Sequence, residues 1–200
     1  MPRPRFEKLP VEQQRAILAA ALREFAAHGY QAASLNRIIE SAGISKGSMY
    51  YYFDDKDDLY AEVIRRELTA LIERGGPIPP PPDTSPEEFW GALEELYLRL
   101  MRLLEQSPEA AALMRGWMGG AGGPSPQQTQ EESVAAMGPW LMRAIDAGQR
   151  AGAVRTDLPP ELIVGMAVSM GTAMDAWLLT QAPERHAESV ALLMVFAFLR

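Results

Sequence analysis

The segment from Ser34 to Lys56, SLNRIIESAGISKGSMYYYFDDK, constrains the fold more strongly than any other part of this chain. A short stretch with regularly spaced apolar residues precedes Gly43, and a second short stretch with three consecutive tyrosines follows it. Glycine can end a helix in the left-handed conformation without steric cost, and the hydroxyls of Ser34 and Ser45 can cap the two helix starts. The segment therefore predicts two short helices joined by a tight turn.

Each of these predicted helices has an apolar face and a polar face. The positions expected to meet inside the elbow are apolar or aromatic: Leu35, Ile38, Ile39, Ile44, Met49 and Tyr52. The opposite face of the second helix carries one charge, three hydroxyls and a residue small enough for close approach: Lys46, Gly47, Ser48, Tyr50 and Tyr51. Such groups suit DNA phosphates and base edges, so the pattern indicates a DNA-binding elbow. An ordinary helical hairpin with a solvated polar face is the alternative.

The stretch GISKGSMYYYFDDKDDLY resembles the DNA-binding signature of the TetR family of bacterial transcriptional regulators. The preceding stretch, AILAAALREFAAHGYQAASLNRIIESA, resembles the first two helices of the same family, so the resemblance runs without a gap. It implies an all-α protein with an N-terminal three-helix helix-turn-helix domain that binds DNA. A fourth helix would then connect this domain to a larger C-terminal helical domain that dimerises and usually binds a small molecule.

The resemblance also implies roles for individual residues in DNA binding. By position, Ser34, Tyr51 and Lys56 would contact phosphates. Lys46, Gly47, Ser48 and Tyr50 would face the major groove, and Ser45 completes the predicted DNA-binding set. Two positions depart from the family pattern, because Ser34 replaces a commoner threonine and Tyr52 stands where histidine is frequent. Tyr52 suits packing as well as contact with DNA.

Proline and glycine content predicts the domain boundaries. We expect a flexible basic arm over 1–10, the helix-turn-helix domain over 11–54, a connecting helix over 55–74, a Pro-rich linker over 75–86 and the C-terminal domain over 87–200. Consecutive prolines cannot continue a helix, although such a run can also serve as a partner-recognition motif. In the arm, Arg3 and Arg5 suit the DNA backbone or a minor groove, and a disordered tail is the alternative.

Charge is unevenly distributed along the chain. The net charge is −7, yet residues 1–53 hold seven Lys or Arg against four Glu. A basic lobe on an acidic body would orient the protein toward DNA.

The absence of cysteine excludes disulfides and thiolate sites. The N-terminal segment lacks the apolar core of a secretion signal, and the charge-free stretch 162–174 is too short and polar to span a bilayer, so we expect a cytoplasmic protein with no membrane partner.

The second half of the chain is predicted to form five helices. Their expected bounds are 86–106, 109–118, 126–151, 160–181 and 183–199, with a kink at Gly138-Pro139. Small residues on the fourth of these helices and apolar residues on the fifth predict a homodimer through a four-helix interface. The alternative is that both faces bury against their own domain.

Aromatic and methionine side chains are predicted to line a pocket for an apolar effector. The candidate ligand-binding residues are Trp90, Tyr97, Met101, Met114, Trp117, Met118, Met137, Trp140, Met170, Met174 and Trp177. Plain core packing is the alternative for this set. Asp175 could orient a polar group or face solvent, and His186 is most simply a surface residue. All four tryptophans follow the linker, so their emission is expected to report the C-terminal domain alone.

No catalytic site, metal site or cofactor is expected. Gly43 to Gly47 formally match G-x-S-x-G, but the preceding segment is helical and the one later histidine, His186, is remote. The function we expect is a ligand-responsive regulator, most simply a repressor that binds a palindromic double-stranded DNA operator as a homodimer. A small apolar or aromatic effector would release it. The alternative is an apolar-ligand carrier or sensor whose N-terminal domain makes protein contacts.

Overall fold

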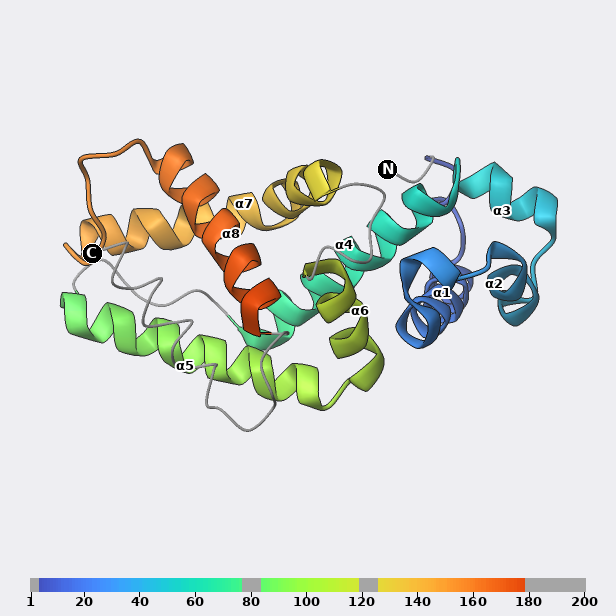
Figure 1. The fold of residues 1–200 in the computed structure, drawn as a ribbon, viewed down its shortest axis with the longest axis horizontal. Helices are drawn as coiled ribbons and strands as arrows, with labels where there is room; N and C mark the ends of the chain where they lie inside the picture. The colour runs from blue at the N-terminus through green and yellow to red at the C-terminus, as the bar shows by residue number, and fades with distance from the viewer. Residues whose placement is uncertain (1–3, 77–83, 119–125, 179–200) are drawn as a thin grey trace. The chain divides into compact units, whose positions relative to one another are not determined.

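The computed structural model describes residues 4–76, 84–118 and 126–178, which form α-helices joined by turns and loops (Figure 1). The helices are α1 (Val11–Ala32), α2 (Leu35–Ala42), α3 (Lys46–Tyr52), α4 (Lys56–Gly75), α5 (Pro86–Glu105), α6 (Pro108–Met118), α7 (Pro126–Arg150) and α8 (Pro160–Leu178). The predicted all-α fold is confirmed. The last predicted helix, 183–199, lies outside the described residues, and so does part of the predicted dimer interface.

The chain divides into two compact units. Unit 1 comprises Met1–Ala70 with Ser107–Pro126, and unit 2 comprises Leu71–Gln106 with Gln127–Arg200. Helix α6 therefore belongs with α1, α2 and α3, and it packs directly against α1. Because Trp117 lies on α6, tryptophan emission also reports unit 1, and the expectation that it reports the C-terminal domain alone is wrong. Periodicity showed that α6 is a helix but could not show which helix it packs against.

Helix α1 contributes one apolar face to the core of unit 1. Ile17, Ala21 and Phe25 are buried at helical spacing, and the backbone N–H groups of Gln13 and Gln14 donate to the Pro10 carbonyl at the helix start. Gly29 adopts φ 66° and ψ 170°, which interrupts the helical geometry shortly before α1 ends at Ala32.

The predicted elbow is present between α2 and α3. Gly43 has φ 66°, and its N–H donates to the Glu40 carbonyl while the Ile44 N–H donates to the Ile39 carbonyl. This hydrogen-bonded left-handed turn ends α2 as expected. Ile38 and Met49 are completely buried, so two of the six predicted inward positions form the centre of the elbow and the others are half-buried.

Unit 2 has its own apolar core. Its buried residues come from α5, α7, α8 and the loop before α8: Phe89, Trp90, Ile145, Ala147, Ala153, Val154, Ile163, Val164 and Val168. Helix α5 starts with a capping box, in which Ser85 Oγ accepts from the Glu88 N–H at 3.3 Å and Glu88 Oε2 accepts from the Ser85 N–H at 2.9 Å. These hydrogen bonds lower the pKa of Glu88.

Across the described ranges, each helix is too short or too polar to cross a membrane.

Candidate nucleic-acid interface and effector site

Helix α3 has polar residues on its exposed face and buries Met49 on the opposite face. Ser45 Oγ accepts from the Ser48 N–H at 3.0 Å and lies 2.8 Å from Ser48 Oγ, so the predicted cap of this helix is confirmed. Tyr50 and Tyr51 are 43% and 48% exposed, whereas Met49, just before them in sequence, is buried. Of the predicted major-groove residues, Lys46, Gly47 and Tyr50 are exposed, whereas Ser48 is half-buried.

The start of α2 is held by a carboxylate from α1. Ser34 makes no side-chain capping hydrogen bond, so its predicted capping role is wrong. Instead, Glu24 Oε1 accepts from the Ser34 N–H and from Arg37 Nε, each at 2.8 Å. A charged acceptor makes a stronger hydrogen bond than a hydroxyl, and its negative charge complements the helix N-terminus. The hydrogen bond from Arg37 lowers the pKa of Glu24. This interaction therefore stabilises the fold fully at pH values above the ordinary glutamate pKa. Its contribution is lost as the pH falls through the lowered pKa of Glu24 in the folded state.

Lys56 holds the C-terminal end of α1 in place. Its Nζ donates to the carbonyls of Tyr30, Gln31 and Ala33 at 2.8, 3.3 and 3.5 Å, and lies 4.5 Å from the centre of the Tyr30 ring. An ammonium group has three donors, so these carbonyls can occupy all of them. A phosphate contact by Lys56, which stays a prediction, would have to replace at least one of these bonds. Sequence spacing gave no signal for this cap.

The N-terminal segment is part of the unit 1 core. The sequence predicts a flexible arm over 1–10, but residues 4–9 form turns and Phe6 is fully buried. Its ring centre lies 4.8 Å from that of Phe53, just after α3. The expectation of a flexible arm therefore does not hold for residues 4–9, because one aromatic side chain ties them to the core. A single apolar residue forms no periodic pattern, so the contact of Phe6 with Phe53 could not be predicted from the sequence.

A buried carboxylate on α4 reinforces this attachment. Glu62 has no exposed side-chain surface and accepts from Arg65 Nε and Arg66 Nε, each at 2.7 Å. Arg66 in turn donates to both oxygens of Glu7 at 3.1 Å and to Gln14 Oε1 at 3.2 Å. The pKa of Arg66 is raised, chiefly by its hydrogen bond to Glu62. The network joins the N-terminal segment, α1 and α4.

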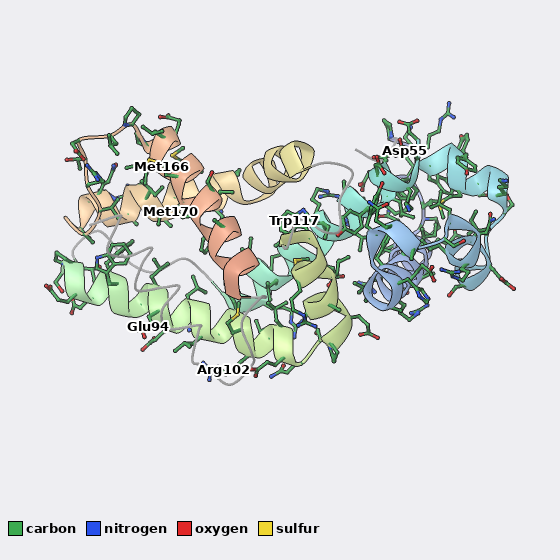
Figure 2. The ribbon with its side chains drawn as sticks, viewed as in Figure 1. Asp55, Glu94, Arg102, Trp117, Met166 and Met170 are labelled. Atoms are coloured by element: carbon green, nitrogen blue, oxygen red, sulfur yellow. The ribbon has the colours of Figure 1, made fainter. Side chains whose placement is uncertain are left out.

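The predicted effector residues divide between the two units. Trp90 belongs to the unit 2 core, whereas Met114 and Trp117 are buried in unit 1. Three further members, Met101, Trp140 and Met170, are half-buried, and Figure 2 labels Met170 on α8. The remaining candidate side chains lie outside the described part of the structure: Tyr97, Met118, Met137, Met174, Trp177, Asp175 and His186. Their roles stay predictions.

Trp117 is the most informative of the candidate effector residues. It is 2% exposed, and its indole Nε1 has no hydrogen-bond partner among the described residues. A buried N–H without an acceptor is costly, so a ligand or water oxygen at this point would stabilise the site. Figure 2 shows Trp117 on α6, the helix that packs against α1. The described residues contain no cluster of three or more His, Asp or Glu side chains that could hold a metal.

Comparison with known proteins places residues 17–63, from α1 into α4, in the family described as bacterial regulatory proteins, tetR family. The HTH-type transcriptional repressor AcnR of Corynebacterium efficiens is 36% identical over 64 residues, covering 32% of this chain and 34% of that protein. The match thus spans about a third of that relative's length. The HTH-type transcriptional repressor Rv1474c of Mycobacterium tuberculosis is 29% identical over 157 residues, covering 76% of this chain and 74% of that one.

Similarity of fold extends over almost the whole chain. The transcriptional regulator FadR from Bacillus subtilis, solved in complex with stearoyl-CoA, has a TM-score of 0.62 and 17% sequence identity. The alignment covers 92% of this chain and 96% of that one. At this level of identity the likeness establishes a shared fold alone. It does not indicate which ligand this chain binds.

Proposed function

Since this chain belongs to the TetR family of bacterial regulatory proteins, we propose that it is a ligand-responsive transcriptional repressor in the cytoplasm. The exposed face of α3 carries the proposal, because it joins a cation, hydroxyls and a glycine on a helix whose other face is anchored by Met49. Backbone phosphates and major-groove base edges are the partners that such a surface fits.

A homodimer would give this surface its specificity. Two copies of a short recognition helix read two half-sites, so a two-fold symmetric protein selects a palindromic operator. Small residues on α8, including Gly165 and Ala167, allow close helix approach and support the proposed dimer interface. Two α3 surfaces at a fixed separation would then occupy consecutive major grooves and block access to a promoter.

The effector would act through α6. The indole N–H of Trp117 has no acceptor among the described residues and could make one polar contact with an effector, on a helix whose Leu113 and Met114 are also buried. The stearoyl-CoA bound to FadR shows that a protein of this fold can hold a ligand with a long apolar chain. Because α6 packs on α1 and α1 packs on α2, a ligand that moves α6 would change the position of the elbow and lower operator affinity.

Substitutions on α3 test the DNA-binding assignment. With a fluorescent duplex that the wild-type chain has selected from a random-sequence pool, Lys46→Ala should weaken binding about tenfold and reduce the salt dependence, because each protomer then brings one cation fewer to the DNA and fewer counterions are displaced. Tyr51→Phe should weaken binding a few-fold with little change in salt dependence, since only a neutral hydroxyl is removed. Fluorescence anisotropy across a salt series measures both effects.

Arg15→Ala provides the matched control, because it removes the same charge from an exposed position on α1. Far-ultraviolet circular dichroism should show all three variants folded. Affinity that is unchanged in both α3 variants, or reduced equally in Arg15→Ala, would contradict a DNA-binding role for this face.

A further inference from the structure

Residues 4–9 lie against the end of α3, next to the surface proposed to contact DNA. The Phe6 ring is fully buried, 6.2 Å from the ring of Tyr52 and 4.8 Å from that of Phe53. The Leu9 N–H donates to the Phe6 carbonyl at 3.0 Å and closes a turn. The residue immediately before Phe6 therefore has a defined position relative to α3.

From that position the Arg5 guanidinium lies over the ring of an exposed tyrosine, Tyr51. Its guanidinium carbon lies 4.4 Å from the centre of the Tyr51 ring, and both residues are exposed. When cation–π attraction holds a guanidinium over an aromatic ring, its five N–H donors can still reach an acceptor. An arginine held in this way can bind a phosphate through two donors and needs little further ordering.

Side chains from α1 and α4 also hold this segment through hydrogen bonds. Gln14 Nε2 donates to the Leu9 carbonyl at 2.9 Å and to the Glu7 carbonyl at 3.3 Å. The Glu7 carboxylate accepts from Arg66. These contacts restrict the segment before any ligand is present, so the entropy cost of placing the Arg5 charge beside α3 is met during folding.

We propose that Arg5 and Tyr51 form a composite phosphate-binding element, in which one backbone phosphate of the operator accepts from the Arg5 guanidinium and the Tyr51 hydroxyl. The inference rests on the proposed DNA-binding function and assigns a contact outside the helix-turn-helix. The Tyr51 ring has two roles in this element: its hydroxyl contacts the phosphate, and its face orients Arg5. These roles can be separated experimentally, since phenylalanine keeps the face and leucine removes it.

The test combines Arg5→Ala with Tyr51→Phe and Tyr51→Leu, alone and in pairs, using anisotropy of the selected duplex across a salt series. Arg5→Ala should weaken binding about tenfold and reduce the magnitude of the slope of log affinity against log salt by about 1.8, because a homodimer on two half-sites loses two neutralised phosphates at about 0.9 each. When Arg5 is present, Tyr51→Leu should weaken binding more than Tyr51→Phe does. When Arg5→Ala is combined with either change, the two Tyr51 variants should have equal affinity, because no guanidinium remains to be oriented.

Lys8→Ala is the matched control, since Lys8 is an exposed cation in the same segment. Its effect should be at least threefold smaller than that of Arg5→Ala, because attraction to a distant charge is screened by salt. Equal effects of the two variants, or Tyr51→Phe and Tyr51→Leu variants that bind alike when Arg5 is present, would overturn the composite element. A wild-type chain that selects no duplex would contradict the proposed function itself, and the element with it.

Discussion

Replacing Phe6 with alanine is expected to lower the free energy of unfolding of unit 1 by about 3–5 kcal/mol, the range for removing a fully buried aromatic ring. The ring has no exposed surface and contacts Tyr52 and Phe53, so its removal leaves a cavity beneath the end of α3. Relaxation of the short N-terminal segment should place the result toward the lower end of that range. Urea unfolding followed by far-ultraviolet circular dichroism and by tryptophan emission, to which Trp117 contributes the signal of unit 1, measures the change.

Phe6→Leu is the control for this prediction. Leucine keeps most of the apolar contact, so its cost should stay below about 1.5 kcal/mol. The alanine variant should also bind the selected duplex more weakly, because the residues that follow α3 lose their packing partner. An unfolding midpoint for Phe6→Ala equal to that of the wild type would show that the N-terminal segment does not stabilise the unit.

Opposite effects are expected from the same substitution at two helical glycines of unit 2. A Cβ at Gly148 on α7 would lie 2.4 Å from Val154 Cγ2 and 2.8 Å from Phe89 Cζ, whereas one at Gly91 on α5 would meet no atom of the described residues within 4 Å. Alanine is favoured over glycine in a helix by roughly 0.5–1 kcal/mol at either position. Overpacking in the core costs about 1–3 kcal/mol, and this cost applies at Gly148 only.

Gly91→Ala should therefore raise the melting temperature, and Gly148→Ala should lower it, with unfolding free energies that differ by about 1–3 kcal/mol. Thermal unfolding by circular dichroism compares them under identical conditions. If Gly148→Ala is as stable as Gly91→Ala, the close packing of α7 against α5 and the following loop is not present in solution.

The elbow could be predicted from the sequence because local chemistry determines it. Gly43 and Ser45 terminate and cap their helices through groups within a few residues, and the observed bounds of α2 and α3 agree with this interpretation. Most helix bounds in the second half also follow from apolar spacing and proline positions. The assignments of individual residues to DNA or effector contacts stay predictions.

The features that the sequence did not predict depend on contacts between distant residues. Glu24 takes over the capping role expected of Ser34, and Lys56 binds carbonyls at the end of α1. The packing of α6 against α1 is likewise a contact between residues that are distant in the sequence. Hydrophobic periodicity identifies a buried face but not its partner, so these interactions appear only when the helices are placed together.

Selection of DNA by the intact wild-type chain tests the central claim most directly. The protein would be mixed with a random-sequence duplex pool, and the bound molecules recovered over several rounds and sequenced. We expect enrichment of an inverted repeat whose half-sites are separated by about one helical turn, roughly 10 base pairs, or a multiple of it. A pool without an enriched motif after binding at physiological salt would contradict the proposal that this chain is a sequence-specific DNA-binding regulator.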